Sequence, residues 1–238
     1  MDSRAVPGGR ARLSAPRWHP SPNFGPRRDG ARPDMVILHY TAMEGAAAAL
    51  ERLCEPGPEV SAHYLLGADG AVWQLVAEEA RAWHAGAGAW GDVDDVNSRS
   101  IGIELANRGD HPFAAAQMTA LEHLLAGVMA RWAIPPERVL GHSDIALGRK
   151  IDPGPRFDWR RLARGGLAVW PAPAAPGDFL ADARRAGYRW AGTTEDAETL
   201  VCDAFRLRFR PWGRGPVGAA DRAMMAGLAA GWPCLGGD

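Results

Sequence analysis

The sequence predicts an α/β protein with a mixed central β-sheet flanked by helices, followed by a small C-terminal unit of three helices. Short apolar runs typical of buried strands occur between residues 35 and 141. Helical patterns separate several of these runs, as in a sheet covered on both faces. Beyond residue 177 the patterns are helical only.

Five strands are expected. Residues 35–39 read MVILH, a continuous apolar run that suits a strand buried on both faces. Residues 101–105 alternate between isoleucine or leucine and smaller or polar residues, which is the period of a half-buried strand. Further strands are expected at 63–66, 71–76 and 139–141, and a turn at 68–70 joins the second and third of the five into a hairpin.

Two helices are expected between these strands. Residues 45–53 form a short alanine-rich helix that ends before the sequence Pro-Gly-Pro at 56–58. Apolar residues recur at helical spacing from 113 to 132, which predicts a long amphipathic helix ended by prolines 135 and 136. The first 34 residues are rich in Pro, Gly and Arg and are expected to be irregular.

The chain divides into three parts by composition. Residues 1–164 are expected to form one domain that includes the irregular N-terminal segment. Residues 165–177 are rich in Pro, Ala and Gly and predict a semi-rigid linker. Residues 178–238 hold helical patterns at 179–187, 198–209 and 219–230. These helices predict either a small separate domain or a cap packed on the first domain.

The segment 139–159 carries the residues best suited to catalysis or metal binding. His142, Lys150 and Asp152 lie among glycines and prolines, which predicts an ordered loop after a short strand. A second histidine, such as His39 at the end of its strand, would complete a set of two imidazoles and a carboxylate. Such a set holds zinc and leaves its fourth position open. The alternative is that His39 is only a hydrogen-bonded histidine at the rim of the sheet.

Glu104 stands at the centre of an otherwise apolar strand. An unpaired buried carboxylate is costly, so its presence needs a reason. Either it pairs with an arginine such as Arg99 or Arg108, or it faces a polar cleft.

Five sequence motifs in this order resemble the zinc-dependent N-acetylmuramoyl-L-alanine amidases of the type-2 family, related to the peptidoglycan recognition proteins. The motifs are VILHYTA, SAHYLL, AWHAG, NSRSIGIELAN and GHSDIALGRKIDPG, and the similarity covers about residues 18 to 160. The resemblance implies that His39, His142 and Asp152 bind zinc (Zn2+). It also implies that Glu104 is the catalytic acid/base and that Lys150 stabilises the developing oxyanion.

The resemblance further implies a reaction and its substrates. The enzyme would hydrolyse the amide bond between N-acetylmuramic acid and L-alanine in peptidoglycan fragments or recycled muropeptides. The alternative is a catalytically inactive protein that recognises peptidoglycan. A zinc peptidase is a third interpretation, but the helical HExxH motif is lacking.

Five residues are candidates for substrate contact. Trp83 and His84 precede a Gly-rich stretch, and an aromatic ring and an imidazole there suit sugar or peptide contacts. Asn97 and Arg99 could bind peptide carboxylates, and His63 could reach the cleft. His63 has a structural alternative as a core histidine, and Arg99 has one as a surface charge. The C-terminal helices also resemble the peptidoglycan-binding domain that follows the amidase in some relatives, mainly through AFRLRFRP at 204–211.

Composition narrows the partners and the compartment. A formal net charge of −1 gives no support for nucleic-acid binding. The three cysteines have no metal-binding spacing and suggest no disulfide framework. No transmembrane span and no apolar signal-peptide core occur, so a cytoplasmic location is expected. A periplasmic or cell-envelope location is expected instead if the sequence is trimmed. The sequence does not indicate an oligomeric state.

Overall fold

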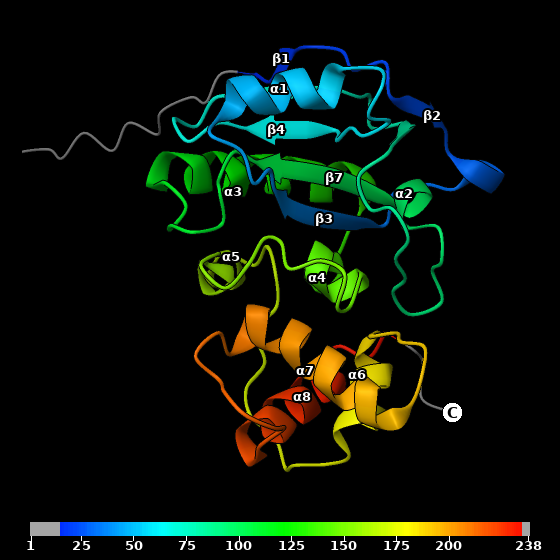
Figure 1. Cartoon of the computed structure of the whole chain (residues 1–238), viewed down its shortest axis with the longest axis vertical. Coiled ribbons are helices and arrows are strands. Elements are labelled where there is room, and N and C mark those ends of the chain that lie inside the picture. The colour runs from blue at the N-terminus through cyan, green and yellow to red at the C-terminus, as the bar shows by residue number, and fades with distance from the viewer. Residues whose placement is uncertain (1–14, 235–238) are drawn as a thin grey trace, which may run out of the picture.

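A six-stranded sheet forms the centre of the molecule (Figure 1). The computed structural model describes residues 15–234 of the chain. The strand order is β1-β5-β4-β7-β3-β8, and all neighbouring strands are parallel except β4 and β5. The sheet is therefore mixed, as the sequence predicts. In chain order its strands are β1 (Arg17–Trp18), β3 (Met35–Tyr40), β4 (Tyr64–Leu66), β5 (Val72–Gln74), β7 (Ser100–Leu105) and β8 (Val139–Gly141).

The five predicted strands are all present, although β5 is shorter than the predicted 71–76. The segment predicted to be irregular contains two strands in its described part, β1 and β2 (Phe24–Pro26). β2 pairs antiparallel with β6 (Ala80–Ala82), which was also not predicted. These short strands are stabilised by pairing with distant segments, so their own sequences carry little periodic signal.

One face of the sheet packs against α3 (Ala115–Trp132) and α5 (Trp159–Arg164). Val36 and Leu38 of β3 lie on this face together with Ile101 and Ile103 of β7. Side chains alternate along a strand, so their neighbours His39 and Glu104 lie on the other face. This alternation sends both polar side chains away from the apolar core under α3.

The other face is covered by two separate groups of elements. α1 (Ala46–Cys54) packs on the β4 and β5 end of the sheet, where Leu65 and Leu75 are buried. Met35, Ile37 and Leu140 at the β3 and β8 end pack in a second cluster that includes the C-terminal helices. The space between the two groups lies over the carboxyl ends of β3 and β7. Ligands of open α/β sheets commonly bind at such ends.

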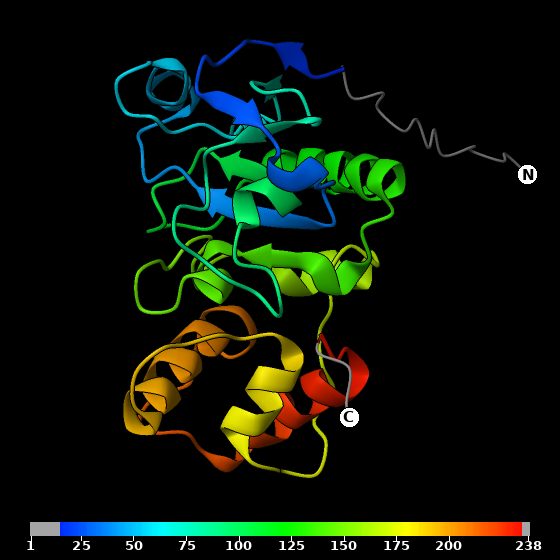
Figure 2. The same ribbon diagram turned by 90° about the vertical axis from the view of Figure 1, so that its right-hand side faces the viewer.

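The three C-terminal helices are α6 (Phe179–Ala186), α7 (Thr194–Phe209) and α8 (Ala219–Gly231). Figures 1 and 2 show them at the end of the molecule that carries α4 (His142–Ile145) and α5, opposite α1. Phe179 and Phe205 belong to the same hydrophobic cluster as Ile37 of the sheet. This shared core corresponds to the cap alternative. Whether these helices also bind glycan stays a prediction.

The segment predicted as a linker, 165–177, contains neither helix nor strand. Its first part is nevertheless packed, because Ala168 and Val169 are buried. Every helix within residues 15–234 is too short or too polar to cross a lipid bilayer.

Candidate metal centre and active site

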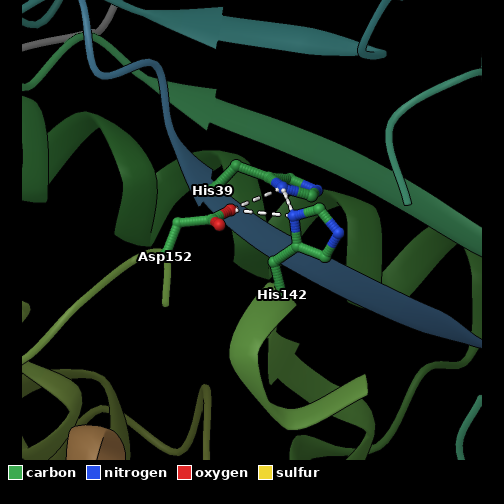
Figure 3. Close-up of side chains that lie close together, drawn as sticks. All are labelled: His39, His142 and Asp152. Carbon is green, nitrogen blue, oxygen red and sulfur yellow. Dashed lines mark hydrogen bonds and ion pairs between the residues drawn. The ribbon is translucent and has the colours of Figure 1, made fainter. Parts of the chain in front are cut away.

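Three side chains converge at the carboxyl ends of β3 and β8 (Figure 3). His39 Nδ1 lies 3.0 Å from His142 Nδ1, and each of these nitrogens lies 2.9–3.0 Å from Asp152 Oδ2. His39 is the fifth residue of β3, and His142 opens α4 directly after β8. Asp152 comes from the following loop, which is fixed where the Ser143 N–H donates to the Asp152 carbonyl at 2.9 Å. The sequence prediction that these three meet is confirmed.

The hydrogen bond from His142 to Ala85 shows which of its two ring nitrogens carries the proton. Its Nε2 lies 2.9 Å from the carbonyl oxygen of Ala85, which can only accept. His142 Nε2 therefore carries the proton, and in a neutral ring Nδ1 keeps its lone pair. That lone pair points to His39 and Asp152.

A chain of hydrogen bonds orients His39 in the same way. Ser100 Oγ donates to the Val96 carbonyl at 2.6 Å, so it accepts from His84 Nε2 at 3.2 Å. His84 Nδ1 is then the acceptor for His39 Nε2–H at 3.0 Å. This order leaves His39 Nδ1 without a proton, facing the other two atoms.

Burial keeps His39 in the protonation state that binds a metal. Burial and the nearby His142 lower the pKa of His39 to about 4, so the ring is neutral near pH 7. Two nitrogen lone pairs and a carboxylate oxygen about 3 Å apart repel one another unless a cation lies between them. The three residues therefore fit a divalent metal ion.

Glu104 is the register partner of His39 across β7 and β3. Its Oε2 is buried and has no hydrogen-bond partner among residues 15–234. Burial and the negative charge of Asp152 raise the pKa of Glu104 to about 8, while Lys150 opposes this rise. The carboxylate thus faces a polar cleft rather than an arginine, which settles the alternative that the sequence left open.

The cleft beside these residues is a cavity of about 550 Å³. Trp83, His84 and Lys150 line it together with Glu104. Further lining residues come from the segment after β3 and from α1, among them Tyr40, Thr41, Met43 and Arg52. The sequence reasoning missed this second group because nothing in a short alanine-rich helix marks the wall of a cleft.

Lys150 is the single lysine in a chain with 27 lysines and arginines. All the other residues in this group are arginines. A lysine retained at one place, inside a cavity with Glu104, indicates a need for a compact ammonium group.

Three predicted substrate-contact residues lie outside the cavity lining. The side chain of His63 is fully buried, and its Nδ1 accepts the Gly102 N–H at 2.9 Å. Arg99 pairs with Asp34 and lines a different cavity. In these positions the two side chains stabilise the fold and do not reach the cleft.

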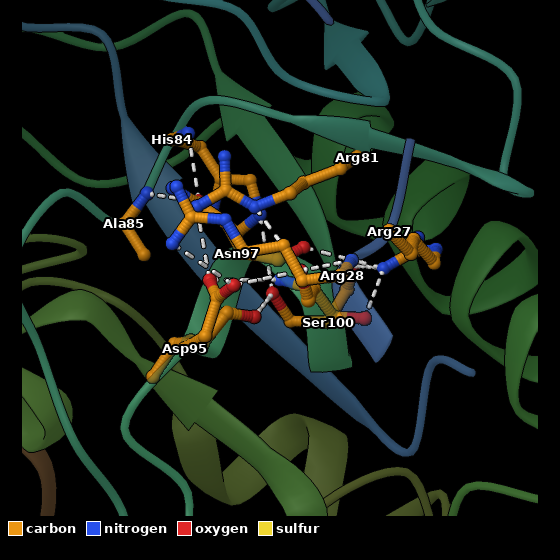
Figure 4. A network of polar contacts seen from close by, with 10 residues as sticks. Arg27, Arg28, Arg81, His84, Ala85, Asp95, Asn97 and Ser100 are labelled. Atoms are coloured by element: carbon orange, nitrogen blue, oxygen red, sulfur yellow. Dashed lines mark hydrogen bonds and ion pairs between the residues drawn. The ribbon is translucent and has the colours of Figure 1, made fainter. Parts of the chain in front are cut away.

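Asn97, on α2 (Val96–Arg99), is buried as well. Its Oδ1 accepts the backbone N–H groups of His84 and Ala85 at 3.1 and 2.9 Å. Figure 4 shows it inside a larger polar network. Asn97 therefore holds the loop that carries His84 and the carbonyl bonded to His142, and its part in the site is indirect.

His84 also has a different place from the one expected. It lines the cavity, but its ring is bonded on both sides by His39 and Ser100. Burial and the nearby His39 hold its pKa well below the usual range. Both ring nitrogens are engaged, so His84 orients His39 and has no free nitrogen for substrate. Ser100 and Gly102, which complete this arrangement, were not identified as site residues from the sequence.

Comparison with known proteins agrees with the geometry. A family model for N-acetylmuramoyl-L-alanine amidases matches residues 29–155. The N-acetylmuramoyl-L-alanine amidase AmiD of Escherichia coli (strain K12) is 38% identical over 209 residues, covering 74% of this chain and 75% of that protein. The 1,6-anhydro-N-acetylmuramyl-L-alanine amidase AmpD of Citrobacter freundii is 31% identical over 167 residues, covering 63% of this chain and 89% of the relative.

Comparison with solved structures also finds similarity to these amidases. A complex of the Escherichia coli AmiD with the substrate anhydro-N-acetylmuramic acid-L-Ala-D-γ-Glu-L-Lys superposes with a TM-score of 0.77 at 36% identity, covering 84% of this chain and 90% of that one. AmpDh3 of Pseudomonas aeruginosa in complex with anhydromuramic pentapeptide gives 0.78 at 30% identity, covering 96% and 99%. The match in sequence spans the whole converging site from His39 to Asp152, and the chain belongs to the N-acetylmuramoyl-L-alanine amidase family.

Proposed function

We propose that this protein is a zinc enzyme that hydrolyses the amide bond between N-acetylmuramic acid and L-alanine in muropeptides. The observation that carries the proposal is the convergence of His39, His142 and Asp152 beside Glu104 and Lys150 in one cavity. The relatives named above are amidases for this bond, and two of their structures hold anhydro-muropeptides.

The donor set supports zinc as the metal. Two imidazole nitrogens and one carboxylate oxygen are common ligands of catalytic zinc, and three protein ligands leave one position open. Bound zinc supplies Lewis acidity, which polarises a carbonyl and makes water a stronger nucleophile at neutral pH. His39 and His142 would bind through Nδ1, the nitrogen that the hydrogen bonds leave free.

Glu104 is proposed as the proton carrier. It would accept a proton from the attacking water and deliver it to the nitrogen of the leaving L-alanine. An acid/base group works best when its pKa is close to the working pH, and the pKa of Glu104 is raised to about 8. Its unpartnered Oε2 gives it the freedom to bond to a reacting molecule.

Lys150 is proposed to stabilise the negative charge that develops on the carbonyl oxygen. It lies two residues before Asp152 on the same loop and lines the same cavity. The Lys150 N–H donates to the Ala146 carbonyl at 3.1 Å, which fixes the backbone at this point. A fixed backbone limits the volume that the ammonium group explores and so prepares it for the transition state.

Trp83 is proposed to contact the sugar or the peptide stem. It lines the cavity and is only partly buried. A flat apolar ring suits contact with a sugar face and adds orientation without charge.

The proposal is tested with a defined anhydro-muropeptide and mass spectrometry of the products. We expect release of the intact peptide with a free L-alanine amine, and loss of this activity after removal of metal by a chelator. Added zinc should restore it, and metal analysis should give one zinc ion per chain. Cleavage at another bond, or full activity in the chelated protein, would contradict the proposal.

A further inference from the structure

Asp144 lies two residues after His142 and is completely buried. Its carboxylate accepts three hydrogen bonds. The Gly141 N–H donates to Oδ2 at 2.8 Å and thereby closes the first turn of α4, the turn that carries His142. Tyr188 Oη donates to Oδ1 at 3.1 Å, and Arg208 Nη1 donates to Oδ2 at 3.0 Å.

Two of these three donors come from the C-terminal part of the chain. Arg208 lies in α7, and Tyr188 follows α6. The Tyr188 ring packs edge-on against Trp90 with ring centroids 4.9 Å apart. The Arg208 guanidinium lies over the ring of Trp159, 4.1 Å from its centroid. Packing therefore fixes the positions of Tyr188 and Arg208 independently of their hydrogen bonds to Asp144.

The ion pair between Arg208 and Asp144 is poorly explained by stability alone. Arg208 is 4% exposed and Asp144 is 0% exposed, so both charges have lost their hydration. Within the described part of the chain, Arg208 Nε and Nη2 find no hydrogen-bond partner. A buried pair with unmatched donors gains little over an apolar replacement. Such a pair does fix two elements in one relative position, since a shift would leave a buried charge alone.

We infer that the C-terminal helices are part of the metal site, because Arg208 and Tyr188 hold the turn that positions His142. They are positioning residues, and neither touches the proposed metal ligands' binding atoms. Residues that orient metal ligands commonly contribute 10–100-fold to metal affinity. The inference rests on the proposed metal site and is independent of the substrate.

Arg206 offers a matched control on the same helix. It is 8% exposed and pairs with the buried Asp221 at the start of α8. Its remaining hydrogen bonds go to the carbonyls of Gly215 and Pro216, all within the C-terminal part. Arg206→Met therefore removes a buried ion pair of similar kind from α7 without touching α4.

The test measures zinc affinity of the full-length variants by competition with a chromophoric chelator, together with the absorption spectrum of the cobalt-substituted proteins. Arg208→Met is expected to weaken zinc binding about 10-fold or more and to shift the cobalt spectrum. Arg206→Met should leave both as in the wild type, even if it lowers thermal stability as much. Tyr188→Phe removes one hydroxyl only and should weaken binding in the same direction by less.

Wild-type affinity and spectrum in Arg208→Met would overturn the inference, and so would equal losses in the two arginine variants. If Arg208→Met does not fold, Tyr188→Phe decides the question, and an unchanged affinity there overturns it. Failure of the proposed function is distinguishable, since it would appear as zinc-loaded wild-type protein that does not cleave the muropeptide.

Discussion

The imidazole of His84 occupies the space that a side chain at Gly102 would fill. A Cβ placed on Gly102 would lie 2.4 Å from two ring carbons of His84, closer than any real contact. The strand that carries Glu104 thus has a gap next to it, and the ring that orients His39 fills this gap. The absence of a side chain in β7 is as much a part of the site as the residues that are present.

Gly102→Ala should therefore displace His84 and weaken the metal site. We expect destabilisation of about 1–3 kcal/mol from overpacking and a loss of zinc affinity of about 10-fold. Chemical denaturation and a zinc titration measure the two effects. Gly25→Ala is the control, because a Cβ there meets nothing within 4 Å. Unchanged zinc affinity in Gly102→Ala would show that the orientation of His84 does not matter for the metal.

Glu104→Gln keeps the size of the side chain and removes its acid/base function. Turnover should fall by about 10²–10⁴-fold, while the zinc content and the KM stay close to those of the wild type. Steady-state kinetics on a defined muropeptide and metal analysis provide the readouts. The exposed Glu79→Gln serves as a control for the same change of charge. Near-normal turnover in Glu104→Gln would mean that another group transfers the proton.

The single lysine allows a chemical test of Lys150. An acetylating reagent removes the charge from Lys150 and the terminal amine only, so we expect it to inactivate the wild type with a kcat loss of about 10²–10³-fold. Lys150→Arg, which keeps a charge but has no amine there, should retain part of the activity and resist the reagent. If both proteins lose activity in parallel, the loss comes from the modification of a group other than Lys150, and the proposed role of Lys150 is contradicted.

Asp221 should make stability depend on pH in the acid range. Burial opposes its ionisation, but hydrogen bonds from Arg206 and the Gly218 N–H outweigh it and lower the pKa of Asp221 to about 2. The unfolded carboxyl has an ordinary pKa near 4, so its contribution is complete above about pH 4 and is lost as pH falls toward 2.

We expect this contribution to reach about 2 kcal/mol. Urea unfolding of the wild type and of Asp221→Asn, in chelator at several pH values between 2 and 6, measures it. The difference in unfolding free energy should shrink between pH 4 and 2. A difference that stays constant over this range would show that the ionisation of Asp221 is not perturbed by folding.

Much of this architecture could be predicted from local patterns. The apolar run of β3 and the alternation in β7 specify strands by themselves, and the run of β3 places His39 at its carboxyl end. His142 and Asp152 could be proposed as metal ligands because an imidazole and a carboxylate lie in one ordered loop among glycines and prolines. The single helical turn of α4 could not be predicted, because its conformation depends on the Asp144 cap and on hydrogen-bond donors that are distant in the sequence.

His84 shows why the roles of the remaining site residues could not be predicted from the sequence. From the sequence, an imidazole beside a tryptophan in a Gly-rich stretch looks suited to bind substrate. Its true partners, His39 and Ser100, are 45 and 16 residues away and become neighbours only when the sheet forms. The same holds for Asn97, which acts through the backbone of the His84 loop and not through a ligand.

His39 and Glu104 sit side by side on two hydrogen-bonded parallel strands. Their separation is thus set by the spacing of main chains, a quantity that hardly varies from one sheet to another. Loops that border the cavity can change in length or composition without altering the separation of His39 and Glu104. A scaffold of this kind leaves the choice of sugar and peptide open to variation, while the reacting centre keeps its dimensions.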